Sequence, residues 1–214
     1  QAFGEAGSRV VIEEFLEGEE ASFIAVVSKD KIIPLATSQD HKAVGEGDVG
    51  LNTGGMGAYS PAPIVDERIH QKIIDEVMKP TMDGLISEGS PYLGFLYAGL
   101  MIKDGELKVL EFNCRFGDPE TQPILLRLQS SLVELCLAAI NDDMDSYNIA
   151  WTDKHACGVV IAAEGYPESY ESNKQVTLQE TLDQDMKLFH AGTKLVDDNV
   201  VTSGGRVFCA TALG

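Results

Sequence analysis

The sequence has 214 residues, 44% of them hydrophobic and 23% charged, a composition that excludes disordered and collagen-like chains and suits an ordinary globular protein. Sixteen Lys and Arg residues against 34 Asp and Glu residues give a formal net charge of -18. Because a field of that sign repels phosphate backbones and anionic headgroups, we expect neither nucleic acid nor a membrane as a partner.

The cysteines and the start of the chain indicate its compartment. Cys114, Cys136, Cys157 and Cys209 are widely spaced and form no C-x-x-C pair, a pattern typical of a reduced chain. No apolar stretch approaches the ~18 residues that span a bilayer, and the first residues do not resemble an export signal. We therefore expect a cytoplasmic protein. The missing initiator Met predicts that the chain begins inside a longer gene product.

Strands are expected first along the chain. Residues 9–15, 21–28 and 31–37 are rich in β-branched and aromatic residues and predict a three-stranded meander. From Ser38 to Pro63 the hydrophobic periodicity is lost and glycine is dense. This predicts a long loop that is either functional or disordered.

A helix and a hairpin are expected next. Apolar residues recur at helical spacing from Asp66 to Glu88, and Pro80 is expected to kink or divide that helix. Residues 93–103 and 106–113 then predict two strands joined at Asp104-Gly105, a dipeptide favoured in tight hairpin turns.

Two shorter helices are expected after the hairpin. Asp118 followed by Pro119 indicates a helix N-cap and first turn. Ser131 with Glu134 three residues later indicates a capping box for a second helix that ends near Asn141.

The last part of the chain is expected to be mainly β. Short strand-like runs separated by turn residues lie at residues 158–163, 187–190, 200–202 and 207–212. We therefore predict two units, one over residues 1–147 and a small β-rich unit over residues 148–214.

The strand at residues 108–113 holds the clearest candidates for chemistry. Its alternation places Glu111 and Asn113 on one face, roughly 7 Å apart at their Cα atoms, with Arg115 at the next position of that face. A carboxylate and an amide oxygen suit a hard cation such as Mg²⁺, and a nearby guanidinium suits phosphoryl chemistry. From spacing alone, a solvated strand face that ends in a turn is the favoured interpretation.

Three other stretches permit two interpretations each. The Glu-rich corner at residues 13–20 is typical of a charged turn, or it offers a strand end to a planar base and a carboxylate to a ribose diol. Residues 52–57 form a flexible lid, or their backbone N–H groups approach an anion closely. Asp40-His41-Lys42 follows a strand; Lys42 supplies local positive charge, and His41 fits either a structural hydrogen bond or catalysis.

One apparent motif is rejected. Gly45 to Gly50 matches G-x-G-x-x-G, the fingerprint of dinucleotide-binding folds. No apolar strand leads into it, no helix is predicted after it, and Glu46 and Asp48 would repel a pyrophosphate.

Together these segments carry a resemblance to a known family. Along nearly the whole chain, the sequence resembles the phosphoribosylamine–glycine ligases, also called glycinamide ribonucleotide synthetases, which are ATP-grasp enzymes of purine biosynthesis. The resemblance is carried by residues 13–20, 38–42, 52–59, 111–120, 190–193 and 204–207. The run Arg-Phe-Gly-Asp-Pro-Glu at residues 115–120 is highly specific to that family.

The resemblance implies a fold and an activity. The fold is α+β: an ATP-grasp C-terminal subdomain, with an antiparallel sheet and flanking helices, followed by a small and incomplete β-rich domain. The activity is ATP-dependent ligation of glycine to 5-phosphoribosylamine through glycyl phosphate, with ATP and Mg²⁺ or Mn²⁺ as cofactors. Two alternatives stay open: another ATP-grasp carboxylate–amine ligase, and a non-catalytic acidic module that binds cations.

The resemblance also implies a nucleotide site. The strand end is similar to the hinge that receives adenine in the family, at Glu13, Glu14, Phe15 and Leu16. Glu20 would bind the ribose hydroxyls.

Metal ligands and a transition-state arginine are implied on the next strands. Glu111 and Asn113 match the metal ligands of ATP-grasp enzymes, and Arg115 matches an arginine that stabilises the transferred phosphoryl group or the acyl phosphate. Many ATP-grasp enzymes carry another acidic ligand on the paired strand, but residues 96–100 contain no carboxylate.

The remaining implied roles concern the substrates. Lys42 and His41 would lie near the phosphates or the substrate, while Asp118 and the loop at residues 54–57 would shape the acceptor site. The nucleotide-fold domain and the lysine-bearing triphosphate clamp of the family have no counterpart here. We therefore expect the missing N-terminal half of the same enzyme as a partner.

Overall fold

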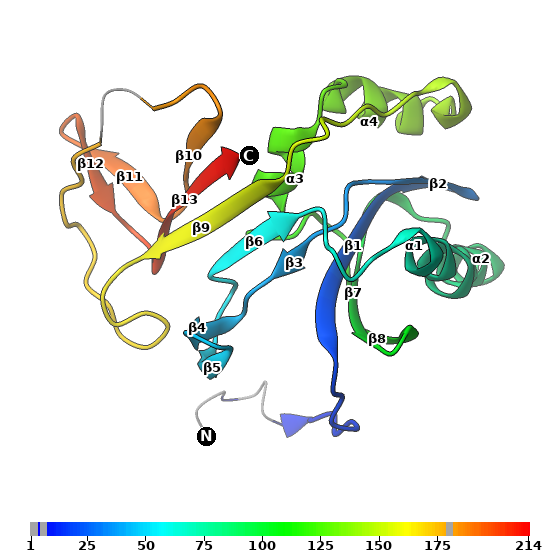
Figure 1. The fold of residues 1–214 in the computed structure, drawn as a ribbon, viewed down its shortest axis with the longest axis horizontal. Helices are drawn as coiled ribbons and strands as arrows, with labels where there is room; N and C mark the ends of the chain where they lie inside the picture. Colours follow the sequence, from blue (N-terminus) through cyan, green and yellow to red (C-terminus); the bar gives the residue numbers. More distant parts are fainter. Residues whose placement is uncertain (1–3, 5–7, 179–181) are drawn as a thin grey trace.

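Two larger antiparallel sheets organise the computed structural model, which describes residue 4 and residues 8–178 and 182–214 (Figure 1). The first sheet has the strand order β2 (Lys31–Pro34), β1 (Glu19–Ser28), β7 (Leu93–Lys103), β8 (Glu106–Asn113). The second has the order β10 (Met186–His190), β13 (Arg206–Leu213), β9 (Ala156–Ala162), β6 (Gly57–Ser60), β3 (Gln39–Asp40). Two hairpins stand beside them: β4 (Ala43–Gly45) with β5 (Val49–Asn52), and β11 (Thr193–Val196) with β12 (Asn199–Thr202).

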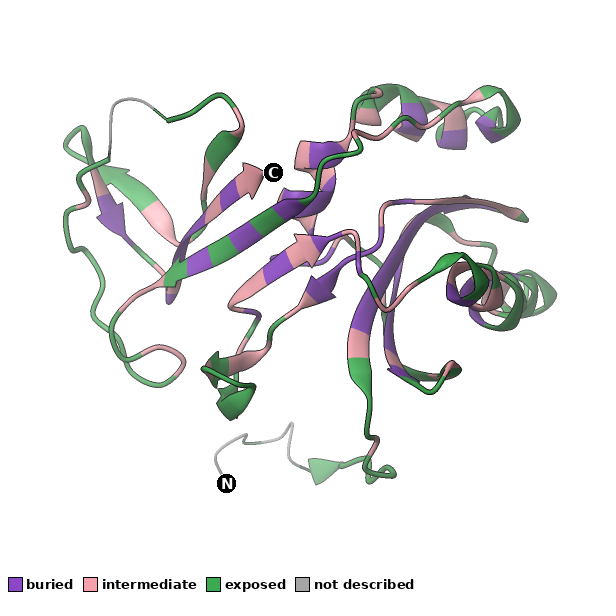
Figure 2. Cartoon of the chain, in the orientation of Figure 1, coloured by how far each residue is buried: buried purple, intermediate pink, exposed green. Residues whose placement is uncertain are grey.

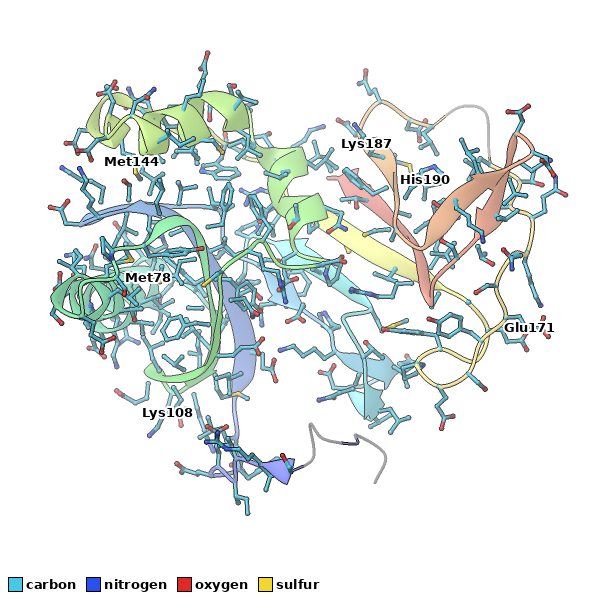
Figure 3. The ribbon with its side chains drawn as sticks, turned by 180° about the vertical axis from the view of Figure 1, so that it is seen from behind. Met78, Lys108, Met144, Glu171, Lys187 and His190 are labelled. Atoms are coloured by element: carbon cyan, nitrogen blue, oxygen red, sulfur yellow. The ribbon has the colours of Figure 1, made fainter. Side chains whose placement is uncertain are left out.

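Strand β1 is buried on both faces and separates two hydrophobic clusters. Phe23 and its alternate neighbours along β1 pack with Ile73, Met78 and other residues of the long helix. Ile24 and Val26 point the other way and pack with Leu135 of α4 (Leu132–Ile140) and with Met144 of the 3₁₀ helix η3 (Met144–Ser146). Figure 3 shows Met78 and Met144 on opposite sides of this sheet. This double cover explains why β1 is almost continuously apolar.

The predicted helix between Asp66 and Glu88 is divided by a π turn. Asp66 caps α1 (Glu67–Ile73) by accepting from the Ile69 N–H. The π segment η2 (Ile74–Met78) follows, and Lys79 donates its N–H to the carbonyl of Ile74 five residues back. The helix α2 (Lys79–Ser87) then begins with Pro80 in its first turn. The wider turn accommodates a proline ring that would clash with the carbonyl four residues earlier.

The β7–β8 hairpin is confirmed, with one irregularity. Asp104 and Gly105 form the turn with φ of 51° and 80°, the left-handed values that an Asp-Gly turn of type I′ requires. A bulge lies at Leu110, because Gly99 pairs with Glu111 while Leu100 pairs with Val109. The predicted strict alternation over residues 108–113 is therefore interrupted. Asn113 pairs with Tyr97, two residues from Gly99, so Glu111 and Asn113 still share a face.

The second sheet joins distant parts of the chain. Helix α3 (Thr121–Arg127) covers one face by packing on β13, β9 and β6. Figure 2 shows β9 alternating between buried and exposed residues, as expected for a strand covered on one face. Strands β3 and β6, and the β4–β5 hairpin, fall in the stretch predicted as a loop, so that prediction is wrong. The sheet contains strands from both sides of residue 148, and the division into units at that residue stays a prediction.

Two further local predictions are wrong. Residues 9–15 form no strand, and their apolar side chains are exposed, with Ile12 at 91%. Strand propensity reflects packing on a partner, and no described strand pairs with this segment. Asp118 does not cap α3; the N-cap position is Glu120, because the Asp118 carboxylate binds Arg206 and Gln122 instead. The cap of α4 is confirmed: Ser131 accepts from the Glu134 N–H.

The remaining expectations concern redox state and membranes. All four cysteines are free thiols. Among the described residues, no helix combines the length and the apolar character needed to cross a membrane.

Candidate functional site

A cavity of about 470 Å³ gathers many of the predicted site residues. It lies where the start of β1, the segment before it and the β3–β4 connection meet, with Met101 of β7 as part of its wall. Five lining residues were predicted: Phe15, Leu16, Glu20, His41 and Lys42. Lining residues that the sequence reasoning did not assign include Gln39, Asp40, Asn52 and Tyr59.

An ion pair joins two of the predicted residues inside this cavity. Lys42 Nζ donates to Glu20 Oε2 at 2.5 Å. Burial lowers the pKa of Lys42, but the bond to Glu20 and the charges of Asp40 and Glu111 outweigh it and raise the pKa. The lysine therefore stays charged, as its predicted role near phosphates requires. The His41 ring lies beside the Tyr59 ring, with centroids 5.5 Å apart. The backbone carbonyl of His41 accepts a hydrogen bond from the Met56 N–H.

An acidic cluster joins Asp40 in the cavity wall to the buried Glu120. Glu120 is 3% exposed and accepts a hydrogen bond from Ser22 Oγ at 2.9 Å, and Ser22 Oγ lies 3.0 Å from the Tyr97 hydroxyl. Burial, followed by the charge of Glu120, raises the pKa of Asp40 to about 6. Burial and Glu120 likewise raise the pKa of Tyr97. The sequence reasoning missed this cluster, although Asp40 and Glu120 lie in segments that carry the family resemblance.

Glu111, Asn113 and Arg115 form a continuous polar row at the end of β8. Asn113 Nδ2 donates to Glu111 Oε1 at 3.1 Å, and Arg115 donates to Asn113 Oδ1 at 3.3 Å. Arg115 also donates to the Phe116 carbonyl at 2.8 Å. The three side chains therefore converge as predicted, and the Glu111 charge contributes to the raised pKa of Lys42 across the site.

This row fits a divalent cation that brings further ligands of its own. The 3.1 Å between the Asn113 amide and Glu111 Oε1 is close to the ~3 Å that separates adjacent oxygen ligands of a Mg²⁺-sized ion. Binding such an ion requires the amide to turn its oxygen toward Glu111. No group of three or more His, Cys, Asp or Glu suited to a metal occurs in the described part of the chain. Glu111 and Asn113 supply two oxygen donors, so a cation held there would take its remaining ligands from other molecules, such as the oxygens of a phosphate.

The other six predicted residues do not line the cavity, and besides the three of the polar row they are Glu13, Glu14 and Asp118. Glu13 and Glu14 line a neighbouring groove of about 380 Å³ together with Lys108. Asp118 faces Arg206, whose Nη2 lies 3.0 Å from Asp118 Oδ2.

The glycine-rich stretches have structural contacts of their own. The N–H groups of Gly54, Gly55 and Met56 donate to the Tyr166 hydroxyl, the Thr53 hydroxyl and the His41 carbonyl. They are thus used inside the fold instead of facing an anion. Gly47 lies in the turn between β4 and β5, and a strand follows it, which confirms the rejection of a dinucleotide fingerprint there.

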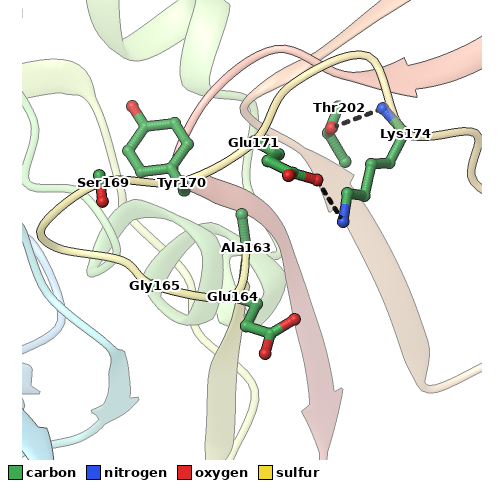
Figure 4. Close-up of a pocket in the computed structure, with 8 residues that line it drawn as sticks. All are labelled: Ala163, Glu164, Gly165, Ser169, Tyr170, Glu171, Lys174 and Thr202. Carbon is green, nitrogen blue, oxygen red and sulfur yellow. Dashed lines mark hydrogen bonds and ion pairs between the residues drawn. The ribbon is translucent and has the colours of Figure 1, made fainter.

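A larger cavity of about 650 Å³ lies near β12, away from the predicted residues (Figure 4). It is lined mainly by residues 163–174, and its lysine, Lys174, is paired with Glu171 at 2.7 Å. None of the residues assigned to nucleotide or metal binding contributes to it.

Family models and known proteins match the sequence of this chain. Residues 1–121 match the family model of the phosphoribosylglycinamide synthetase ATP-grasp (A) domain, and residues 156–214 match that of the phosphoribosylglycinamide synthetase C domain. The chain is 59% identical over 215 residues to the phosphoribosylamine–glycine ligase of Vibrio parahaemolyticus, and 60% identical over 218 residues to that of Salmonella typhimurium. Each alignment covers 100% of this chain and 50% of the relative.

A solved structure agrees with these matches. The crystal structure of phosphoribosylamine–glycine ligase from Thermotoga maritima is similar, with a TM-score of 0.80 and 37% identity over 94% of this chain and 50% of that chain. The chain therefore spans about half the length of the relatives it matches.

Proposed function

The chain belongs to the phosphoribosylglycinamide synthetase family, and we propose on this premise that it forms part of the active site of an ATP-dependent phosphoribosylamine–glycine ligase. The observation that carries the proposal is the 60% identity to a ligase of that name over the whole of this chain. The Glu111 charge of the polar row on β8 acts on Lys42 in the cavity, and this electrostatic link between the two supports the proposal.

The proposed reaction has two steps. A carboxylate oxygen of glycine attacks the γ-phosphorus of ATP, which forms glycyl phosphate and releases ADP. The amine of 5-phosphoribosylamine then attacks the glycyl carbonyl, loses a proton and expels inorganic phosphate. The product is glycinamide ribonucleotide.

In this proposal the cavity binds the nucleoside part of ATP. Phe15 and Leu16 offer apolar surface and backbone polar groups to adenine, and Glu20 accepts from the ribose hydroxyls. Lys42 holds the Glu20 carboxylate in place and adds positive charge on the phosphate side. Glu13 and Glu14 belong to the same segment before β1 but line the neighbouring groove.

The row on β8 would serve the phosphoryl groups. Glu111 and Asn113 would hold a divalent cation, Mg²⁺ or Mn²⁺, which when bound neutralises charge on the phosphate oxygens. Arg115 lies next to them and donates to the oxygens of the transferred phosphoryl group or the acyl phosphate, where charge grows in the transition state. His41 and Asp118 would border the substrates from the β3–β4 connection and the loop before α3.

A chimeric ligase tests the function. Residues 1–214 replace the matching half of the Salmonella typhimurium relative, which supplies the other half of the chain. We expect ADP release that depends on both glycine and 5-phosphoribosylamine. A folded chimera that prefers another carboxylic acid or bicarbonate would indicate a different ATP-grasp ligase, and one that binds cations but ignores ATP would indicate a cation-binding module.

A further inference from the structure

Arg206, the first residue of β13, binds two loops that are far apart in the sequence. Its Nη1 donates to the carbonyls of Gly54 at 2.5 Å, Asp118 at 2.8 Å and Gly55 at 3.3 Å. Its Nη2 donates to the Asp118 carboxylate at 3.0 Å. The guanidinium therefore has four acceptors from two segments, and its side chain is 22% exposed.

The convergence of these acceptors requires a fixed cation. Three carbonyl dipoles point their negative ends at one place, next to a carboxylate, and repel one another unless a positive charge lies between them. A guanidinium presents several N–H donors in one plane, whereas an ammonium is a point charge on a flexible stem. Replacing Arg206 with lysine would therefore keep the positive charge at this position but lose the simultaneous hydrogen bonds to the two loops.

The two adjacent glycines of the first loop fit this arrangement by their size. A Cβ on Gly54 would lie 3.0 Å from the Arg206 guanidinium carbon. A Cβ on Gly55 would overlap the ring of Pro119, and the Gly55 φ of 108° disfavours any other residue. The Gly-Gly pair is thus a contact surface for Arg206 and for the loop before α3.

The loop before α3 carries Arg115, three residues before Asp118. The start of this loop is held by the strand pairing of Asn113 with Tyr97. Its middle is held by the contact between the Phe116 and Phe95 rings, whose centroids lie 4.1 Å apart. Arg206 holds its end through both the backbone and the side chain of Asp118.

We propose that Arg206 is a positioning residue that fixes the loop bearing Arg115 and the Gly54–Gly55 loop relative to each other. Through it, the last strand of the chain sets the geometry of the phosphoryl site. Its effect on catalysis rests on the proposed ligase function, whereas its effect on the loops does not.

Hydrogen exchange on the 214-residue chain tests the effect on the loops. The variants are Arg206→Met, Arg206→Lys and, as a matched control, Lys194→Met on the exposed β11. In Arg206→Met we expect the amide hydrogens of residues 53–57, 116–118, 120 and 121 to exchange at least about tenfold faster than in the wild type, the effect of losing one hydrogen bond to a charged donor. Arg206→Lys should be intermediate and Lys194→Met unchanged. Unchanged exchange in both loops of Arg206→Lys and Arg206→Met would overturn the proposal.

Kinetics of the chimeric ligase test the effect on catalysis. We expect Arg206→Lys to lower kcat about tenfold or more while the KM for ATP stays within about twofold, with Arg206→Met lower still. If the loops loosen but the folded variants keep the wild-type kcat and KM values, Arg206 is a structural residue only and the positioning role is refuted. A wild-type chimera without glycine-dependent ADP release would instead refute the ligase function, and the exchange result would still decide whether Arg206 fixes the loops.

Discussion

Replacing Asp40 with Asn tests the acidic cluster of Asp40 and Glu120 at the cavity. Burial and the Glu120 charge raise the pKa of Asp40 from 3.8 to about 6. A shift of that size corresponds to about 3 kcal/mol between the two protonation states. Because the folded-state pKa is the higher one, the stability from holding the proton is fully present below pH 3.8 and is lost as the pH rises through about 6.

Asparagine does not titrate, so the Asp40→Asn variant does not lose this stability as the pH rises. We therefore expect Asp40→Asn to match the wild type near pH 4 and to exceed it by up to about 3 kcal/mol near pH 7.5. Urea unfolding at a series of pH values measures the difference, with Asp83→Asn on the exposed side of α2 as the control. A difference that does not change with pH, or a variant that is less stable at pH 7.5, would refute the reasoning. In a Glu120→Gln background, the effect of Asp40→Asn on stability at pH 7.5 should be smaller, since the Glu120 charge contributes to the raised pKa of Asp40.

Further predictions concern packing and the backbone. Gly55→Ala should destabilise the chain by about 2 kcal/mol or more, because the new methyl overlaps a proline ring and φ is 108°; a change within about 0.5 kcal/mol would contradict this. Gly84→Ala, in α2 with open space around the new Cβ, should instead stabilise by roughly 0.5–1 kcal/mol in the same thermal or urea assay. Phe23→Ala should cost about 3–5 kcal/mol, because Phe23 is 1% exposed within the core of the first sheet, and a loss below about 1 kcal/mol would refute that core assignment.

Features set by neighbouring residues could be predicted from the sequence. The Asp104-Gly105 turn and the Ser131 cap depend on side chains and backbone within a few residues, so local chemistry decides them. The shared face of Glu111 and Asn113 survives the bulge because both residues lie beyond it toward the strand end. The polar row on β8 was therefore predictable, and its contacts agree with that prediction.

Features that depend on distant partners could not be predicted this way. Residues 9–15 have strand propensity but no described partner strand, so their apolar side chains are exposed. Asp118 has the sequence signature of an N-cap, but its carboxylate instead accepts a hydrogen bond from Arg206, 88 positions away. The carboxyl groups of Asp40 and Glu120 approach each other only after both sheets form.

The polar row on β8 offers the most direct test of the proposed site. In the chimeric ligase, Glu111→Gln removes the carboxylate charge and keeps the size of the side chain. Steady-state ADP release at varied Mg²⁺-ATP should then show kcat/KM lowered about 100-fold or more, because one of the two proposed cation ligands is lost. The account predicts that loss while the variant keeps its fold and thermal stability. A folded Glu111→Gln enzyme with the wild-type kcat/KM for Mg²⁺-ATP would contradict it.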